Sequence, residues 1–317
     1  NADFPTIIKR SRDVADGMSS GISYLLKKNK VDVINGFGKV KPGNKVSVTI
    51  DGNVADYTAK YIIIATGARS RELPNLPQDG KKVIGYREAL SLPTAPKKMV
   101  IVGSGAIGVE FAYFYNAMGV DVTVVEFMPN IVPVEDVDIS KQLQRSFKKS
   151  GIKVLTKSSV EKIDTSGTGC KVFVKTKKGE ETIEFDMVLS AVGIAANIEN
   201  IGLEEVGIKT DKGKILVDDY YNTNVKGYCA IGDVLSTQAL AHVASAEGIT
   251  CVEKIAGQNP EPIDYGNIPG CTYTSPEIAS VGMTETAAKE AGHDIKVGKF
   301  PFTASGKASA AGHKEGF

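Results

Sequence analysis

The stretch from Lys98 to Glu126 constrains the fold of this chain more than any other. An apolar run ends at three glycines with the spacing G-x-G-x-x-G, apolar residues continue at helical spacing, and a second apolar run ends at Glu126. Gly103 allows a tight turn, Gly105 lets the backbone approach a pyrophosphate, and Gly108 lets a helix pack closely. The stretch therefore predicts a strand–helix–strand unit that binds a dinucleotide.

The remaining binding groups come from the start of the predicted helix and the end of the second strand. The N–H groups of Ala106 and Ile107 are free to donate to phosphate oxygens. Glu126 lies 18 residues after Gly108, where a carboxylate accepts hydrogen bonds from ribose hydroxyls. A glycine turn that binds nothing is the alternative for the motif alone, but here strand, helix, second strand and acid occur together.

Composition excludes several classes of protein. The 317 residues suggest about two domains, and 38 basic against 37 acidic residues give no support for a nucleic-acid or membrane surface. No apolar run reaches the roughly 18 residues of a membrane span. The four cysteines and three histidines lack the spacing of metal ligands. We therefore predict no metal site and a cytoplasmic protein with reduced thiols.

Periodicity predicts the other elements. Helices are expected at residues 4–30, 138–150 and 240–255, with another starting at Thr284. Strands are expected at residues 31–34, 61–68, 152–155, 160–163, 187–193, 227–234, 271–273, 278–281 and 295–300, and hairpins at 45–58 and 171–185.

Two features of this pattern have more than one interpretation. The segment Ile62–Gly67 resembles Val188–Gly193, so the chain either repeats a nucleotide-binding unit whose first copy lacks the phosphate loop, or contains two buried strands that look alike by chance. Asp233 follows a short apolar strand. It either faces a ligand at the sheet edge or caps the next helix.

Five segments occur in an order that resembles one protein family. They are Ile62–Ala68, Gly103–Glu110, Ala230–Val234, Leu240–Gly248 and Tyr273–Gly282. Together they are similar to the flavoprotein disulfide reductases with two dinucleotide-binding domains. Val124–Phe127 and Leu240–Ala244 are closest to the dihydrolipoamide dehydrogenase branch of that family.

The resemblance implies an α/β fold with two Rossmann-like dinucleotide-binding domains, the first incomplete, and the start of an α+β dimerisation domain. Residues 1–97 and 218–262 would belong to the FAD-binding domain, residues 98–217 to the NAD-binding domain, and residues 263–317 to the dimerisation domain. It also implies a homodimer in the full-length protein and, as partner, the lipoyl domain of 2-oxoacid dehydrogenase complexes.

In the dihydrolipoamide dehydrogenase branch of this family, electrons pass from dihydrolipoamide through a cysteine pair to FAD and then to NAD. By the match, the residues near NAD are Gly103, Gly105, Ala106, Ile107, Gly108, Glu110, Glu126 and Gly193, the nicotinamide half lying near Glu110 and Gly193. The residues near FAD are Thr66, Gly67, Gly232, Asp233, Leu240, Ala241 and His242. Asp233 would bind the ribityl chain, and residues 240–242 would contact the flavin through backbone atoms.

The chain also departs from the family pattern. The family carries an N-terminal flavin fingerprint and a Cys-x4-Cys pair, and no two cysteines here lie five apart. Its catalytic base is a histidine followed by proline, whereas Asp294 and Lys314 follow His293 and His313. Residues 194–197 replace an Arg-Arg-Pro-Asn-like run. We therefore expect an internal fragment that contains no catalytic residues, does not oxidise dihydrolipoamide and is purified colourless.

Several alternatives remain. The chain could belong to a transhydrogenase-like or mercuric-reductase-like member of the family, or be a non-catalytic NAD-binding or assembly module. A glutathione-reductase-like member is less favoured, because Glu126 would repel a 2′-phosphate and residues 127–130 contain no basic cluster. The sequence therefore predicts tighter binding of NAD than of NADP.

Overall fold

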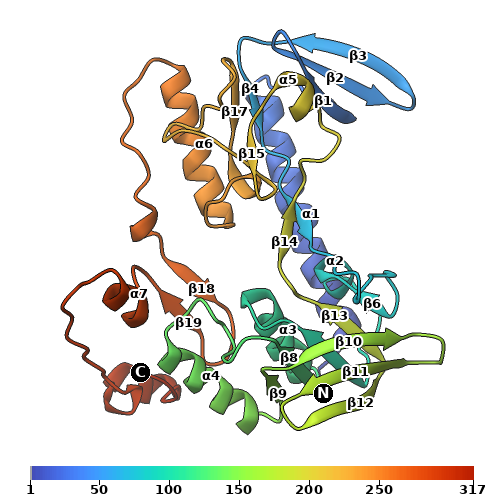
Figure 1. The fold of residues 1–317 in the computed structure, drawn as a ribbon, viewed down its shortest axis with the longest axis vertical. Helices are drawn as coiled ribbons and strands as arrows, with labels where there is room; N and C mark the ends of the chain where they lie inside the picture. The colour runs from blue at the N-terminus through green and yellow to red at the C-terminus, as the bar shows by residue number, and fades with distance from the viewer. Residues whose placement is uncertain (1) are drawn as a thin grey trace. The chain divides into compact units, whose positions relative to one another are not determined.

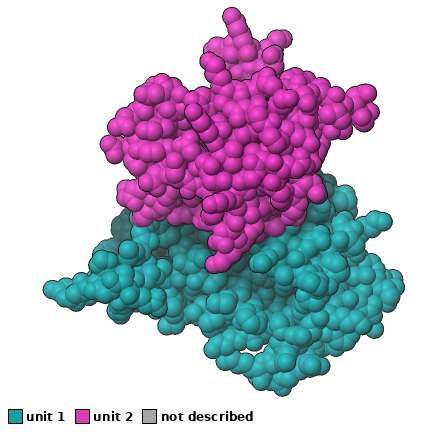
Figure 2. Space-filling view, turned by 45° about the horizontal axis from the view of Figure 1, so that its top comes forward, with its two compact units in different colours: residues 1–17, 70–193, 269–317 teal, residues 18–69, 194–268 magenta. Residues whose placement is uncertain are grey.

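The structure, a computed structural model, describes residues 2–317, which form two compact units (Figure 2). Unit 1 comprises residues 1–17, 70–193 and 269–317, and unit 2 comprises residues 18–69 and 194–268. The residues of the long first helix α1 (Phe4–Lys28) are divided between the two units.

A parallel five-stranded sheet organises unit 1 (Figure 1). Its strands, in spatial order, are β6 (Val83–Ile84), β13 (Met187–Ser190), β7 (Lys98–Val102), β8 (Asp121–Glu126) and β9 (Lys153–Thr156). The helices around it are α2 (Tyr86–Ala89), α3 (Ala106–Ala117) and α4 (Val137–Lys149). Because α3 connects β7 to β8 and α4 connects β8 to β9, the carboxyl ends of these strands lie at one edge, where α/β sheets bind ligands.

Successive side chains of β7 alternate between two hydrophobic cores, as the pleat of a strand requires. Met99 and Ile101 pack in a cluster with Tyr115 of α3 and with residues of α4. Val100 and Val102 pack on the other face. That face is covered by an antiparallel sheet of β10 (Ser159–Asp164), β11 (Cys170–Thr176) and β12 (Gly179–Phe185).

The C-terminal part of unit 1 consists of short elements. They are β18 (Gly270–Thr272), β19 (Ile278–Ser280), α7 (Glu285–Glu290), η3 (Phe302–Ala304) and α8 (Gly306–Ala311). The Thr284 hydroxyl accepts a hydrogen bond from the Ala287 N–H and so caps the start of α7, as the sequence predicts.

Unit 2 contains a small parallel pair of strands, β4 (Ile62–Ile64) and β17 (Tyr228–Ala230). The residues that precede β4 in the sequence form a separate antiparallel sheet of β1 (Phe37–Lys41), β2 (Lys45–Ile50) and β3 (Asn53–Thr58). The other elements are β14 (Ile194–Ala196), α5 (Leu203–Val206), β15 (Thr210–Asp211), β16 (Lys214–Ile215), η1 (Gly232–Val234), α6 (Ala241–Ile255) and η2 (Tyr265–Asn267), together with β5 (Ala68–Ser70), whose last residue is assigned to unit 1. Asp51 and Gly52, both with positive φ, form the turn of the predicted β2–β3 hairpin.

The structure confirms the predicted helices and most of the predicted strands. The strands predicted at residues 31–34 and 295–300 are wrong, because neither segment pairs with a strand among residues 2–317. Val31, Val33 and Ile34 are exposed, and β-branched composition does not form a strand without a neighbour to pack against. Strand β1 was not predicted.

The two compact units divide the chain at different residues from the predicted domains. Residues 70–97 belong to unit 1, where β6 extends the parallel sheet, and residues 194–217 belong to unit 2. The assignment of the chain to FAD-binding, NAD-binding and dimerisation domains stays a prediction.

Candidate functional site

The glycine-rich loop of unit 1 has the geometry that its spacing predicts. Gly103 has φ +99°, and a Cβ there would lie 2.3 Å from the Ala191 carbonyl oxygen. A Cβ on Gly108 would lie 2.1 Å from the Gly103 carbonyl oxygen, so α3 approaches the loop as closely as backbone allows. A Cβ on Gly105 would meet nothing within 4 Å. The loop is therefore tight on its inner side and open at Gly105.

The open side of the loop leads into the start of α3. Gly105 is the N-cap residue, and no side chain caps the helix. The first N–H groups of α3, including those of Ala106 and Ile107, are thus left for water or a ligand, and the helix dipole favours an anion there. This arrangement fits a pyrophosphate.

Glu126 lies at the end of β8 and is 7% exposed. Its Oε2 accepts hydrogen bonds from the Ser104 N–H (2.8 Å) and hydroxyl (2.6 Å), and its Oε1 accepts one from the Met128 N–H (2.7 Å). A carboxylate has about four acceptor positions, so three contacts leave one on Oε1. The structure therefore places the predicted acid against the loop and adds Ser104, which the sequence did not indicate.

Glu110 and Gly193, the other two residues predicted near NAD, each accept a hydrogen bond from a backbone N–H. The Glu110 carboxylate, on the first turns of α3, accepts a hydrogen bond from the Tyr273 N–H at 2.8 Å. Gly193, with φ +108°, follows β13 and accepts a hydrogen bond from the Arg71 N–H through its carbonyl oxygen.

In unit 2 the predicted FAD residues lie after the two parallel strands. Thr66 and Gly67 follow β4, and Gly232 and Asp233 follow β17. Gly67 and Gly232 both have positive φ, +68° and +74°. Parallel strands end at one edge, so the structure brings the two turns to the same side of the β4–β17 pair.

Leu240, Ala241 and His242 lie at the start of α6. Leu240 is the N-cap residue in extended conformation, and no side chain caps the helix. Asp233 therefore does not cap α6, and that interpretation of Asp233 is wrong. The first N–H groups of α6 are therefore left for water or a ligand, and the contact of residues 240–242 with the flavin stays a prediction.

A buried carboxylate that the sequence reasoning missed holds the Gly232 turn. Glu247 of α6 has no exposed surface, and its Oε2 accepts a hydrogen bond from the Gly232 N–H at 2.6 Å. Its Oε1 accepts one from the Tyr265 hydroxyl at 2.8 Å, and that hydroxyl lies 2.9 Å from the Tyr221 hydroxyl. Burial, with these hydrogen bonds, raises the pKa of Tyr265 well above its usual range, so it remains a donor.

The sequence contained one signal for Glu247. It shares a face of α6 with Val243, Thr250 and Cys251, which are all buried, so its spacing places a charged residue on the apolar face of the helix. A carboxylate at such a position requires hydrogen-bond partners.

Other classes of site find no support among the described residues. No group of three or more His, Cys, Asp or Glu residues could hold a metal ion within residues 2–317. In the same range, no helix has the length and apolar composition needed to cross a membrane. Cys170, Cys229 and Cys251 are buried free thiols, and burial raises the pKa of Cys229 to about 12, which makes it a poor nucleophile.

Residues 2–248 match the pyridine nucleotide-disulphide oxidoreductase family, and residues 268–317 match its dimerisation domain. The chain belongs to the pyridine nucleotide-disulphide oxidoreductase family. It is 47% identical to a dihydrolipoyl dehydrogenase of Rhizobium etli, over 99% of this chain and 69% of that protein. It is 42% identical to the leghemoglobin reductase of Glycine max, over 98% of this chain and 60% of that protein.

Solved structures show the same fold. The LpdA protein of Mycobacterium tuberculosis superimposes with a TM-score of 0.92 at 28% identity, over all of this chain and 70% of that chain. The HOCl-induced flavoprotein disulfide reductase RclA of Escherichia coli gives 0.89 at 25% identity, over 99% of this chain and 72% of that chain. These comparisons confirm the predicted family, its α/β fold and its class as flavoprotein oxidoreductases that use pyridine nucleotides.

Proposed function

We propose that this chain carries the NAD site and part of the FAD site of a dihydrolipoyl dehydrogenase. Its curated relatives at 45–47% identity from three bacteria have that name, and the family match extends over both its nucleotide-binding and its dimerisation parts. The substrate is then the dihydrolipoamide of a lipoyl domain, and the active protein is a homodimer. A cytoplasmic location stays a prediction.

One observation carries the proposal for NAD: the glycine loop is tight at Gly103 and Gly108 but open at Gly105, beside the uncapped start of α3. The pyrophosphate would accept hydrogen bonds from the N–H groups of Ala106 and Ile107. The free acceptor position of Glu126 would take a ribose hydroxyl. Glu110 and Gly193 would lie toward the nicotinamide.

The proposal for FAD rests on the two turns after β4 and β17. Thr66–Gly67 and Gly232–Asp233 present backbone at one edge of the strand pair, and the uncapped start of α6 presents further N–H groups. The Asp233 carboxylate would hold the ribityl chain, and residues 240–242 would lie beside the flavin.

Each group of residues has a separate task in this proposal. FAD and NAD supply the two-electron redox chemistry, and the residues named here bind and orient them.

The four cysteines of these 317 residues contain no Cys-x4-Cys pair. We therefore expect the purified 317-residue polypeptide to bind NAD but not to oxidise dihydrolipoamide, because no dithiol accepts the electrons.

The first prediction concerns the choice between NAD and NADP. In calorimetric titrations NAD is expected to bind about tenfold or more tightly than NADP, because the Glu126 carboxylate accepts from a 2′-hydroxyl and repels a 2′-phosphate. Glu126→Gln should reduce this ratio toward one. Asp121→Asn removes the same charge from the opposite end of β8 and should leave the ratio unchanged. Equal or tighter binding of NADP by the unchanged protein would overturn the assignment.

A further inference from the structure

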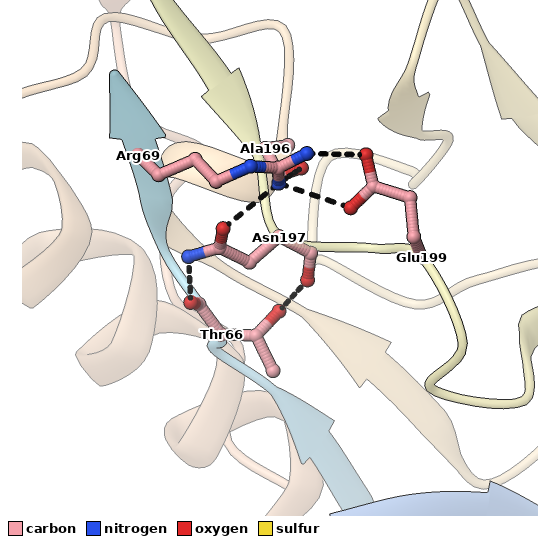
Figure 3. A network of polar contacts seen from close by, with 5 residues as sticks. All are labelled: Thr66, Arg69, Ala196, Asn197 and Glu199. Atoms are coloured by element: carbon pink, nitrogen blue, oxygen red, sulfur yellow. Dashed lines mark hydrogen bonds and ion pairs between the residues drawn. The ribbon is translucent and has the colours of Figure 1, made fainter. Parts of the chain in front are cut away.

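A network of polar contacts joins two segments of unit 2 that are far apart in the sequence (Figure 3). One segment, residues 66–69, follows β4, and the other, residues 196–199, begins at the last residue of β14. Both belong to unit 2, and the first contains the turn that the proposed function assigns to FAD.

The Arg69 guanidinium is the centre of the network. Its Nη2 donates to Glu199 Oε1 at 2.8 Å and its Nη1 donates to Glu199 Oε2 at 3.0 Å, so the carboxylate holds it with two bonds. Nη1 also lies 3.1 Å from the Ala196 carbonyl oxygen and 3.0 Å from Asn197 Oδ1. Arginine alone presents this rigid planar fork, which lysine does not reproduce. Glu199 therefore fixes the direction in which Arg69 meets Asn197.

The contact with Arg69 sets the orientation of the Asn197 amide. Because Oδ1 faces the guanidinium, Nδ2 faces the other way and donates to the Thr66 carbonyl oxygen at 3.0 Å. Two more bonds tie the same segments together: the Thr66 hydroxyl donates to the Asn197 carbonyl oxygen at 2.6 Å, and the Asn197 N–H donates to the Gly67 carbonyl oxygen at 2.9 Å.

These bonds determine where the next peptide N–H points. In a planar trans peptide the carbonyl and the N–H point in opposite directions. With the Thr66 carbonyl directed at Asn197, the Gly67 N–H is directed away from it, and it has no acceptor among residues 2–317. A Cβ on Gly67 would meet nothing within 4 Å, so a ligand can approach this backbone closely.

We propose that Arg69 is a positioning residue which, held by Glu199, orients the Asn197 amide and thereby aims the Gly67 N–H at an oxygen acceptor of FAD. The proposal rests on the FAD site proposed above and assigns it a relay, Glu199–Arg69–Asn197–Thr66, whose first two members do not touch the ligand. Arg69 and Glu199 are exposed, so their contribution lies in orientation more than in ion-pair energy.

The test compares three variants of the 317-residue chain. Arg69→Met removes the fork, and Arg69→Lys keeps the charge without the fork. Arg71→Met is the matched control, because Arg71 is exposed and its side chain forms no hydrogen bond among residues 2–317. Two quantities are measured. The first is the rate of hydrogen exchange at the backbone N–H of Asn197, which donates to the Gly67 carbonyl oxygen. The second is the affinity for FAD, titrated by flavin fluorescence. The second measurement detects weak binding that purification would lose.

In both Arg69 variants we expect exchange at Asn197 to be about tenfold faster and FAD affinity to fall several-fold, with no change in Arg71→Met. Unchanged exchange in Arg69→Met, or full rescue by Arg69→Lys, would overturn the relay. Faster exchange with unchanged FAD affinity would overturn the aiming of Gly67. Absence of any FAD binding by the unchanged chain would instead overturn the proposed FAD site, and with it the role of the relay toward FAD.

Discussion

The Gly103–Gly108 loop of unit 1 and the Gly232–Asp233 turn of unit 2 both follow a parallel strand, and in both regions a buried carboxylate accepts a backbone N–H. In unit 1 the carboxylate is Glu126, from the next strand, and it is 7% exposed. In unit 2 it is Glu247, from the helix after the turn, and it has no exposed surface.

Because of this difference in position, Glu126 can contact a ligand, whereas Glu247 contributes only to the packing around its turn. Glu126 keeps one acceptor position at the ligand edge of the sheet, so it can serve the loop and a ribose together. Glu247 accepts from Gly232 and Tyr265 and has no exposed surface, so no ligand can reach it and it can only shape the turn. A buried acid near a glycine turn is therefore not by itself a ligand contact.

The largest expected effects come from alanine substitutions in the loop of unit 1. Gly108→Ala places a Cβ 2.1 Å from a backbone oxygen, so we expect the free energy of unfolding to fall by about 3 kcal/mol or more. Gly105→Ala places its Cβ in open space and should cost less than about 1 kcal/mol, but weaken NAD binding about tenfold. Thermal unfolding and calorimetry measure the two quantities. Equal stability of both variants would contradict the described packing.

The next effect tests whether Glu247 acts through packing alone. Glu247→Ala leaves the Gly232 N–H and the Tyr265 hydroxyl without an acceptor, which should cost about 3 kcal/mol of unfolding free energy. Glu247→Gln keeps the shape and one acceptor and should cost about 1 kcal/mol. NAD affinity should stay unchanged in both, whereas Glu126→Ala should reduce it. If Glu247→Ala weakened NAD binding in a protein that remains folded, the distinction between the two carboxylates would be wrong.

The two regions also differ in how far the sequence predicts them. In unit 1 the glycines and Glu126 lie within 24 residues and along one strand–helix–strand unit, so spacing alone places them together. In unit 2 the contact between Arg69 and Glu199 spans 130 residues and depends on which strands pair. Glu247 requires Tyr265, from a short helix that has no sequence signal. Local patterns therefore predicted the glycine loop and the position of Glu126, but not the contacts that shape the two turns of unit 2.

The same reason explains the errors in the predicted strands. The segment 31–34 has the composition of a strand but lacks a neighbour within residues 2–317, whereas β1 contains Gly38 and two lysines and forms because β2 pairs with it along all five residues. The similarity between Ile62–Gly67 and Val188–Gly193 was more informative. Both segments are parallel strands followed by a glycine with positive φ, as a repeated unit predicts.

The smallest expected effect concerns the Arg69–Glu199 pair. Hydrogen bonds from Arg69 lower the pKa of Glu199 from 4.5 to about 2. Because the folded-state pKa is depressed, the pair stabilises the protein above about pH 4.5, and this stabilisation is lost as the pH falls toward 2. The pair is exposed and screened, so the difference in unfolding free energy between the unchanged protein and Glu199→Gln should not exceed about 1 kcal/mol at pH 7, and should shrink below pH 4. Glu184→Gln, whose carboxylate lies 3.9 Å from Lys171, controls for the loss of one surface charge. Denaturant unfolding from pH 2.5 to 7 measures the difference, and a difference that grew on acidification would have the wrong sign for this pair.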